Sequence, residues 1–527
     1  MKNKWIKPLL RRRIVVALLI LLQVAFFVYF LVSSSYLSSA LSAIFVGISF
    51  FVALFVASGE GENAYKLTWC IVILSFPLVG GVLYLAFSEH FLRYSLNKKA
   101  KIAEKKTRAL TYAMGGTAKA QAEHPRTVRY LSDFLGYPAY TDTKTTFLGS
   151  GREMHARLLE ELEKAEKYIF MEYFIIEHGE MWDSVLEVLL RRVKAGVRVR
   201  IIFDDMGCFL RLPARYPKLL REYGIEVAKF NPFVPFFSVE QNNRDHRKIT
   251  VIDGRVAFTG GINLADEYIE KGSRFGRWAD TAVMLEGGAA WSFALMFLQT
   301  WHMISKSDED FLEYLPAGLS REETQRNIQA AEAEHAAENA VASREPVPVV
   351  LPYADSPLDS ENVGEQVYLQ IIQNAKRYVY ITTPYLIIDD KLISALTLAA
   401  KSGVDVRIIT PHKWDKKIVH KTTRTYYHTL TKSGVRVYEY TPGFMHAKMV
   451  VADDEVAVVG SVNFDFRSFF LHFECGVYLY RNETVDAVRH AFLGYEEVSE
   501  QIHPAPPRKN IFSRLYRAVL RLLAPLM

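Results

Sequence analysis

Long apolar runs dominate the first ninety residues of the chain. Residues 14–32, 40–57 and 67–87 contain no charged side chains, and Gln23 is the one obvious polar residue of the first run. A helix needs roughly 20 apolar residues to cross a bilayer, with a range of about 17 to 25. The pattern therefore predicts a membrane-anchoring region over residues 1–92 with up to three apolar helices.

A cleaved signal peptide is the alternative interpretation of the first run, because Arg11–Arg13 precede it. The run is long for such a peptide, and no small-x-small cleavage site separates it from the second run, so we expect it to stay. Basic residues lie both before this run and over residues 93–108, and each group favours the cytoplasmic side for its own segment. Three full crossings would put the two segments on opposite sides of the membrane, so the two indications conflict. Either the third run re-enters near Pro77, or residues 33–39 turn the first two runs into a shallow hairpin. We expect a multi-pass protein of the cell membrane with a cytoplasmic catalytic region.

Beyond the basic segment, short apolar runs alternate with amphipathic stretches, and the whole alternation occurs twice. The runs 165–176 and 194–205 have counterparts at 375–388 and 401–412. Buried strands joined by helical stretches indicate sheets with helices on their faces. The pattern predicts an α/β protein of two similar lobes, with mixed sheets flanked by helices and a shared cleft.

The changes of pattern also set the expected boundaries. Residues 320–348 are rich in Ala, Glu and Gln, and Pro346 and Pro348 end this stretch, so we expect a solvated linker or a surface helix there. The expected order is a membrane-anchoring region (1–92), a basic connecting segment (93–125), a first lobe (126–317), a linker (318–348), a second lobe (349–505) and a basic amphipathic C-terminal helix (506–527).

The C-terminal helix is expected from the spacing of its arginines. Arg514, Arg517 and Arg521 fall at i, i+3 and i+7. The apolar residues fall on another face: Leu515, Val519, Leu522 and Leu523. Such a helix either lies on an anionic membrane or packs against the protein's own lobe.

One pattern of polar residues occurs twice, 200 residues apart, and supplies the candidate catalytic residues. These are His246, Lys248 and Asp253 in HRKITVID, then His446, Lys448 and Asp453 in HAKMVVAD. Each copy reads as a strand, so its His and Lys, two residues apart, share a face. Each is followed by Gly-Gly-Ile-Asn or Gly-Ser-Val-Asn, whose small residues we expect to let the backbone approach a phosphate.

Phosphodiester exchange needs the groups that this pattern offers. One group must attack phosphorus, another must protonate the departing oxygen, and cations or donors must hold the nonbridging oxygens. Two histidines suit the first two roles, because a pKa near about 6.5 lets one imidazole be neutral and the other protonated. The expected phosphate-binding residues are Lys248, Asn263, Lys448 and Asn463. These residues would stabilise the negative charge on the phosphate, as a metal ion does in other enzymes, so we expect neither a metal nor a cofactor.

The doubled HxKxxxxD pattern, with its following Gly-Gly or Gly-Ser and Asn, resembles the signature of the phospholipase D superfamily. Residues 243–268 and 443–468 are more closely similar to the motifs of bacterial cardiolipin synthases, and the resemblance runs from about residue 40 to the C-terminus. It implies a covalent phosphatidyl-histidine intermediate, with one histidine as nucleophile and the other as general acid and then base. The nucleophile of the superfamily is more often the first-motif histidine, which favours His246 with His446 as the acid.

Acidic and basic neighbours of the motifs carry further expectations. Asp253 and Asp453 lie at odd offsets from their histidines, so a structural role is favoured over direct catalysis. Asp280 and Glu474 resemble the downstream acids that orient an imidazole in the family, at offsets of 34 and 28 from the preceding motif histidine. Three arginines are candidates for phosphate contacts, with a surface ion pair as the alternative for the second: Arg244, Arg247 and Arg467.

These features favour a lipid substrate. Residues 230–238 and 438–444 are aromatic and apolar, which fits walls for acyl chains, with a buried core as the alternative. The net charge of +6 is small for 527 residues, and no groove of interleaved basic and aromatic residues is evident, so we expect no nucleic-acid partner. We expect cardiolipin and glycerol to be formed from two phosphatidylglycerol molecules in the membrane. The alternatives are a phospholipase D or phosphatidyltransferase that uses water or another alcohol, a nucleic-acid phosphodiesterase, and an inactive membrane scaffold.

Overall fold

The structure is a computed structural model that describes most of the chain from residue 36 onward. The residues outside the description are 1–35, 60, 78–79, 88–93, 109, 116, 119–124, 233–241, 274, 306, 308, 317, 337–345 and 504–509. The first apolar run and most of the aromatic segment 230–238 therefore lie outside the described residues. The described part divides into two units, and each is treated by itself.

The smaller unit combines the helices that precede Ser95 with the C-terminal helix. Its elements are α2 (Tyr36–Ser58), α3 (Asn63–Ser75), α4 (Gly80–Phe87), α17 (Ile511–Leu523) and the 3-10 turn η5 (Ala524–Leu526). Trp69, Ile73 and Tyr84 pack with residues of α2 in its core. The Thr68 hydroxyl donates to the Leu522 carbonyl at 2.6 Å, so α17 is joined to α3.

The predicted apolar runs appear differently in this unit. The second run forms one helix, α2, but the third forms two, α3 and α4, interrupted beside Pro77. Among the described helices, none combines the length and the apolarity that a bilayer crossing requires. The expected membrane-spanning helices are therefore not confirmed.

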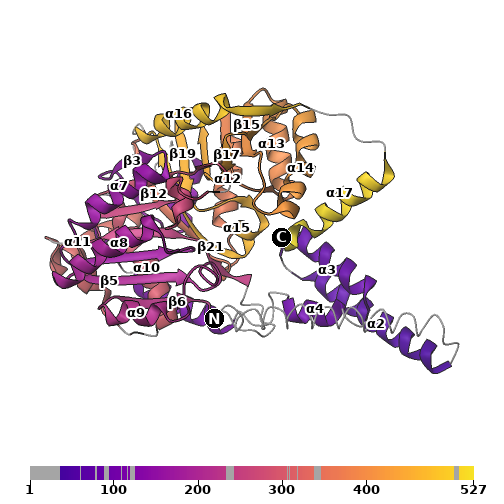
Figure 1. The fold of residues 1–527 in the computed structure, drawn as a ribbon, viewed down its shortest axis with the longest axis horizontal. Helices are drawn as coiled ribbons and strands as arrows, with labels where there is room; N and C mark the ends of the chain where they lie inside the picture. Colours follow the sequence, from indigo (N-terminus) through magenta and orange to yellow (C-terminus); the bar gives the residue numbers. More distant parts are fainter. Residues whose placement is uncertain are drawn as a thin grey trace. The chain divides into compact units, whose positions relative to one another are not determined.

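The larger unit contains two mixed sheets, one for each predicted lobe (Figure 1). The first has the order β3-β11-β9-β8-β4-β5-β6. Its strands are β3 (Lys144–Leu148), β4 (Tyr168–Tyr173), β5 (Arg198–Asp204), β6 (Glu226–Phe230), β8 (Lys248–Ile252), β9 (Val256–Gly260) and β11 (Ala282–Glu286). Strands β4, β5 and β6 run parallel, and the remaining neighbours pair antiparallel.

The second sheet repeats this arrangement and adds strands at its edges. Its order is β1-β2-β12-β21-β19-β18-β13-β15-β16-β22. The strands are β1 (Thr117–Ala118), β2 (Ala139–Tyr140), β12 (Val349–Asp355), β13 (Tyr378–Thr382), β15 (Asp405–Pro411), β16 (Arg436–Tyr440), β18 (Met449–Ala452), β19 (Val456–Gly460), β21 (His472–Tyr480) and β22 (Ser499–Ile502). The register repeats too, because Thr250 pairs with Phe258 in the first lobe and Val450 with Val458 in the second. The predicted two-lobed α/β architecture with mixed sheets is confirmed.

Helices cover the faces of both sheets, as Figure 1 shows for α8, α10, α13, α14 and α16. The helices of this unit are α5 (Tyr94–Arg108), α6 (Arg126–Arg129), α7 (Gly151–Leu162), α8 (Glu180–Lys194), α9 (Tyr216–Glu222), α10 (Ala289–Ser305), α11 (Arg321–Ala336), α12 (Val363–Asn374), α13 (Asp390–Lys401), α14 (Lys417–Lys432), α15 (Phe466–Phe470) and α16 (Thr484–Glu497). Shorter turns are η1 (Tyr130–Phe134), η3 (Asp266–Ile269) and η4 (Phe311–Tyr314). Helix α11 lies in the predicted linker, where a surface helix was one expectation.

Helices α10 and α16 and several strand pairs, among them β2 with β12, join the lobes. Helix α10 packs against β8 of the first sheet and β12 of the second, and α16 packs against β18 of the second sheet and β3 of the first. A helix buried on several sides is apolar around its circumference, which explains the composition of α10. Strand β7 (Arg244–Asp245) pairs with β21, and β10 (Arg277–Ala279) pairs with β17 (Gly443–Met445). A last pair, β14 (Leu386–Ile387) with β20 (Phe464–Asp465), stays within the second lobe.

Candidate active site

Each motif histidine lies just before a central strand of its own sheet. His246 follows β7 and precedes β8, and His446 follows β17 and precedes β18. The main-chain N–H of His246 donates to the Phe473 carbonyl at 2.9 Å, and that of His446 donates to the Ala279 carbonyl at 2.7 Å. Phe473 and Ala279 belong to the opposite lobes. Each histidine is therefore held in place by the lobe that does not carry it.

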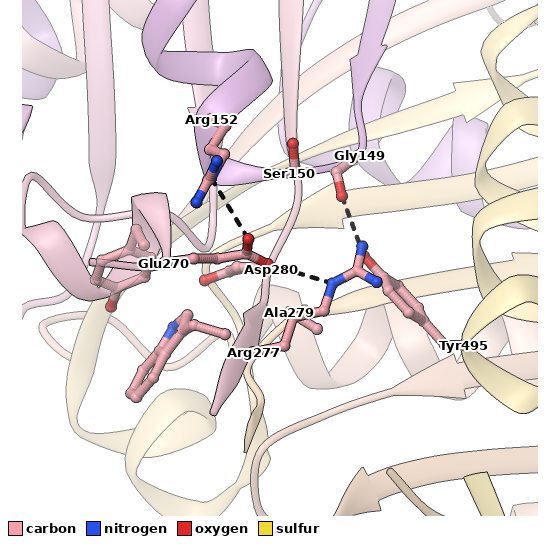
Figure 2. Close-up of a pocket in the computed structure, with 10 residues that line it drawn as sticks. Gly149, Ser150, Arg152, Glu270, Arg277, Ala279, Asp280 and Tyr495 are labelled. Atoms are coloured by element: carbon pink, nitrogen blue, oxygen red, sulfur yellow. Dashed lines mark hydrogen bonds and ion pairs between the residues drawn. The ribbon is translucent and has the colours of Figure 1, made fainter. Parts of the chain in front are cut away.

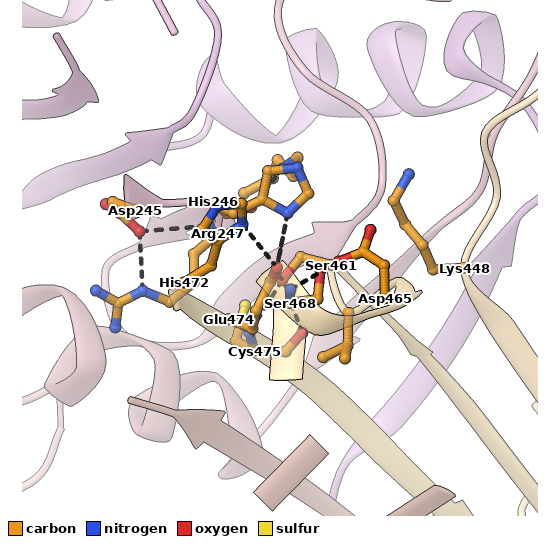
Figure 3. A network of polar contacts seen from close by, with 12 residues as sticks. Asp245, His246, Arg247, Lys448, Ser461, Asp465, Ser468, His472, Glu474 and Cys475 are labelled. Carbon is orange, nitrogen blue, oxygen red and sulfur yellow. Dashed lines mark hydrogen bonds and ion pairs between the residues drawn. The ribbon is translucent and has the colours of Figure 1, made fainter. Parts of the chain in front are cut away.

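The candidate orienting acids also cross between the lobes. Nδ1 of His246 lies 2.9 Å from Glu474 Oε1, within the network of Figure 3, and Nδ1 of His446 lies 2.6 Å from Asp280 Oδ2. The offsets of 34 and 28 measured each acid from the histidine of its own lobe, whereas the structure pairs each acid with the other histidine. A carboxylate beside Nδ1 keeps the ring proton there and leaves the lone pair on Nε2.

Both motif lysines are buried beside the histidines. The ammonium groups of Lys248 and Lys448 each donate to the main-chain carbonyl of the histidine two residues earlier. Lys448 Nζ also lies 2.8 Å from Nδ1 of His446. That nitrogen cannot donate to Asp280 and accept from Lys448 at once, so we assign its proton to the carboxylate contact, which is the shorter.

Burial shifts the pKa values of these groups toward neutral forms. It lowers the pKa of Lys248 to about 8 and that of Lys448 to about 7, with nearby carboxylates opposing the shift. It raises the pKa of Asp280 to about 6, against the pull of Lys448. The pKa of each motif histidine lies well below its ordinary value, first because of burial and then because of the lysines. Burial therefore favours the neutral form of both imidazoles and makes both lysines easier to deprotonate.

The small residues after each motif make room for the crossed acids. A Cβ at Gly261 would lie 2.1 Å from Asp280 Oδ1, so a side chain there would displace the carboxylate. At the equivalent place in the second lobe, the Ser461 hydroxyl donates to Glu474 Oε2 and accepts from the Cys475 N–H. Gly261 and Ser461 thus help to position the two acids, and the expected approach of this backbone to a phosphate stays a prediction.

The motif aspartates, counted among the catalytic candidates, are not brought into the site. Asp253 accepts from the main-chain N–H groups of residues 166, 167 and 168, each at 2.8 Å. Asp453 accepts in the same way from residues 376, 377 and 378 at 2.6 to 2.9 Å. Both aspartates have positive φ angles, 52° and 58°. They anchor the first residues of β4 and β13 to the turns that follow β8 and β18, which is the structural role that their odd offsets favoured.

The two motif asparagines differ in their contacts. Asn263 accepts from the Ile175 N–H at 3.0 Å and donates to the Tyr268 hydroxyl at 2.6 Å. The side-chain oxygen of Asn463 is buried without a hydrogen-bond partner. This oxygen is an acceptor, so a phosphate contact of Asn463 would use the hydrogens on its side-chain nitrogen.

The three candidate arginines do not share one role. Arg247 is buried and paired with Glu172 at 2.7 Å and Asp245 at 3.1 Å, so it is neither a surface ion pair nor open to a phosphate. Arg244 donates to the Asn231 carbonyl at 2.9 Å. Burial lowers the pKa of Arg467, opposed by Asp465.

Several residues near the histidines were not found by sequence reasoning. The rings of Trp278 and Tyr268 lie 5.3 and 5.7 Å from that of His446, and Phe174 and His472 lie 5.1 and 5.5 Å from His246. These residues lie in other strands and loops, outside the doubled HxKxxxxD pattern, so no sequence repeat pointed to them. The aromatic segment 438–444 was expected as a wall for acyl chains, but its residues Tyr440 and Phe444 are buried in the core, which was the alternative.

A small cavity of about 150 Å³ lies behind the Asp280 carboxylate (Figure 2). Arg152 and Arg277 both approach Glu270 at its rim, at 3.4 and 3.3 Å. Tyr495 of the second lobe closes another side through a 3.2 Å hydrogen bond to the Gly149 carbonyl. Residues of both lobes therefore line this cavity, as they do the site around the two histidines.

Comparison with known proteins places this geometry in a family. Residues 158–272 and 368–495 match the family described as "Cardiolipin synthase, PLD-like domain". Residues 45–89 match "Phospholipase D-nuclease N-terminal". The matched ranges contain the crossed acid Glu474 and both motifs but not Asp280.

Individual proteins are similar over most of the chain. An uncharacterized protein of Streptococcus mutans is 40% identical over 482 residues, which cover 90% of this chain and 99% of that protein. A cardiolipin synthase of Alkalihalophilus pseudofirmus is 34% identical over 502 residues, covering 94% of this chain and 95% of that protein. The crystal structure of a phosphatidylserine synthase of Haemophilus influenzae matches with a TM-score of 0.55 at 16% identity, covering 76% of this chain and 100% of that one. This last likeness shows a common fold.

Proposed function

Because this chain belongs to the cardiolipin synthase family of phospholipase D-like proteins, we propose that its two motif histidines transfer a phosphatidyl group between two phosphatidylglycerol molecules. The products are cardiolipin and glycerol. The chain is a phosphatidyltransferase that acts on phospholipids. The observation that carries this mechanism is the pair of neighbouring imidazoles, each held by a carboxylate of the opposite lobe.

In the first half of the reaction, His246 Nε2 attacks the phosphorus of the donor lipid. A bond forms between Nε2 and phosphorus, and the bond from phosphorus to the glycerol oxygen breaks. Glu474 supports this step, because it holds the ring proton on Nδ1 and stabilises the cationic ring of the phosphatidyl-histidine. His446 gives its Nε2 proton to the departing oxygen, so glycerol leaves neutral.

His446 must carry a proton for that step, although burial and Lys448 lower its pKa. A bound phosphodiester brings a negative charge between the two lysines. This charge offsets the ammonium groups of Lys248 and Lys448 and raises the pKa of His446. We therefore expect the acid to become protonated together with lipid binding, with Asp280 stabilising the imidazolium.

In the second half, the terminal hydroxyl of another phosphatidylglycerol replaces glycerol. His446, now neutral, takes the proton of this hydroxyl, whose oxygen attacks phosphorus. The bond from phosphorus to Nε2 of His246 breaks, and cardiolipin leaves. Lys248, Lys448 and Asn463 are the proposed contacts of the nonbridging oxygens, which removes the need for a metal.

Product analysis tests this proposal directly. Purified wild type and His246→Ala receive phosphatidylglycerol alone in detergent micelles without added metal, and the lipids are analysed by thin-layer chromatography and mass spectrometry. We expect cardiolipin and glycerol from the wild type only, with His490→Ala, on the exposed surface, as the active control. Phosphatidic acid in place of cardiolipin would contradict transfer and indicate hydrolysis.

Trapping identifies the nucleophile. A labelled donor lipid is mixed with the enzyme, the reaction is quenched, and the labelled peptide is sequenced by mass spectrometry. The proposal expects the phosphatidyl adduct on His246, since that ring is assigned the attacking role. An adduct on His446 would reverse the two assignments and leave the reaction unchanged.

We also propose that the smaller unit attaches the enzyme to the cell membrane in a multi-pass manner, with the catalytic region in the cytoplasm. Large apolar side chains of α2 that are more than half exposed support the attachment: Ile44, Val46, Ile48, Phe50, Phe51, Leu54 and Phe55. Six basic residues in α5 support the cytoplasmic side. Alkaline carbonate extraction of membranes and protease protection of vesicles test the two parts. Release of the chain by carbonate would refute integral attachment.

A further inference from the structure

Three metal-binding side chains converge at the proposed nucleophile. In the described part of the chain, His246, His472 and Glu474 form the one group of three such residues whose ligand atoms all lie within 4.8 Å of one another. Glu474 Oε1 lies 2.9 Å from Nδ1 of His246 and 3.6 Å from Nδ1 of His472. The fold provides this convergence, because His472 and Glu474 are two residues apart on β21 and β7, just before His246, runs beside them.

His472 takes no part in the proposed reaction, so its ring nitrogen is a candidate ligand for a metal ion. Its Nδ1 is buried and has no hydrogen-bond partner, although its ring lies 5.5 Å from that of His246 (Figure 3). A buried polar atom without a partner is uncommon and costs free energy. The Glu474 carboxylate between the two rings is itself fully buried. Because His472 Nδ1 lies 3.6 Å from this carboxylate, its ring proton faces Glu474 when no ion is bound. An ion that shifted this proton to Nε2 would meet two imidazole nitrogens beside one carboxylate.

We propose that His246, His472 and Glu474 bind a divalent transition ion such as Zn²⁺, and that the bound ion inhibits phosphatidyl transfer reversibly. Two imidazoles and one carboxylate are a ligand set that suits Zn²⁺, with a water molecule as the fourth ligand. Tetrahedral ligands at about 2.1 Å from zinc lie roughly 3.4 Å from one another. The distances from Glu474 Oε1 to the two histidine nitrogens, 2.9 and 3.6 Å, lie on either side of that value, and all ligand atoms lie within 4.8 Å of one another.

Inhibition follows from the single lone pair of a neutral imidazole, and this step rests on the proposed role of His246. When Nδ1 donates its proton to Glu474, the lone pair lies on Nε2 and can attack phosphorus. When the ion occupies Nδ1, the ring proton moves to Nε2 and attack stops. The ion also takes Glu474 from the histidine it orients. The ammonium groups of Lys248 and Lys448 repel the ion, so we expect micromolar binding and not the tighter binding of structural zinc.

Inhibition of the purified full chain by buffered Zn²⁺ is the first test. We expect cardiolipin formation to fall at micromolar free Zn²⁺ and to return fully with a chelator. His472→Asn keeps a polar side chain of similar shape but removes the ligand nitrogen, and we expect it to raise the inhibitory concentration by about tenfold or more. The matched control is His412→Asn, because His412 also lies beside a carboxylate, Glu439, at 3.0 Å, and its loss should change nothing.

Cobalt spectroscopy provides a readout that does not depend on activity. Co²⁺ added to the wild-type chain should give visible d–d absorption bands that saturate at one ion per chain, and His472→Asn should lose them. Absence of these bands in the wild type, an unchanged inhibitory concentration in His472→Asn, or activation by Zn²⁺ would each overturn the proposal. Failure of the proposed function would look different, because the chain would form no cardiolipin even in chelator while Co²⁺ binding still reported on the site.

Discussion

Gly261 and Ser461 occupy equivalent positions in the two lobes but make different contacts with the acids. Asp280 fills the space where a Gly261 side chain would stand, while Ser461 fills that space itself and donates to Glu474. The longer glutamate can receive both Ser461 and His246 on its two oxygens. We infer that Asp280 and Glu474 are not interchangeable, because the length of each side chain fits the residue next to it, Gly261 or Ser461.

The pH dependence of transfer should reflect Asp280 and Lys448. Asp280 must be ionised to stabilise the His446 imidazolium, and its pKa is about 6, so activity should fall as pH drops below that value. Lys448 must be charged, and its pKa is about 7, so activity should fall again above that value. The charged and titratable groups around Asp280 include His446, His246, Lys448 and Lys248. We expect a narrow bell-shaped profile of kcat/KM, which reports the lipid-free enzyme, with its maximum between the two values.

Lys448→Arg separates this explanation from general loss of stability. A guanidinium stays charged across the whole range, so the alkaline limb should move upward by at least about one pH unit, at a lower kcat. Lys432→Arg, at the exposed end of α14, is the control and should leave the profile unchanged. Superimposable profiles of wild type and Lys448→Arg would assign the alkaline limb to another group.

At the scale of elements, the motif aspartates tie each central strand to its neighbour. Asp253→Asn keeps a residue that tolerates positive φ but removes the charge that accepts three N–H groups at the start of β4. We expect a loss of about 1–3 kcal/mol in the free energy of unfolding, because hydrogen bonds to a charged acceptor are the stronger kind. Thermal unfolding of the purified variant measures this. Transfer at low temperature should remain near the wild-type rate.

A surface aspartate provides the comparison. Asp183 forms an exposed ion pair with His178, so Asp183→Asn should change stability by no more than about 0.5 kcal/mol. A folded Asp253→Asn chain with normal Tm and no activity would show instead that the motif aspartates take part in catalysis.

Elements were predictable wherever the period of the sequence was clear. The repeated runs at 165–176 and 375–388 became β4 and β13, and 194–205 and 401–412 became β5 and β15. The third apolar run was left open between a full crossing and a break near Pro77, because hydropathy alone does not decide between them, and the structure has the break. Residues 438–444 were ambiguous for a related reason, since apolar side chains suit a buried strand and a lipid contact equally well.

At the scale of the whole molecule, the crossing of the acids could not be predicted from offsets along the chain. Asp280 and Glu474 were found because they follow the motifs, but their partners are set by β10 with β17 and by β7 with β21. These short pairs join the two lobes, and a sequence read lobe by lobe holds no signal for them. His472 was missed for the same reason, since its neighbour His246 lies in the other lobe.

Helix α17 should lie with one face in the lipid headgroup region. Phe512, Leu515 and Val519 are exposed on one face, and Arg517 lies on another. We therefore expect an environment-sensitive fluorophore at Val519→Cys to be quenched by spin-labelled lipids in phosphatidylglycerol vesicles, and one at Arg517→Cys to be quenched much less. Cys70→Ser removes the native cysteine that is not buried. Equal quenching at both positions, or at neither, would contradict this orientation.

The repeated lobes resemble two copies of one unit whose histidines borrow each other's carboxylates. In an assembly of two identical chains, every substitution would occur on both sides, and the halves would stay alike. A single chain removes that restraint, so one half can keep glycine and aspartate where the other has serine and glutamate. Because the two lobes belong to one chain, their histidines can take different roles. One imidazole can hold the lipid while the other transfers the proton, and each still depends on a carboxylate of the other lobe.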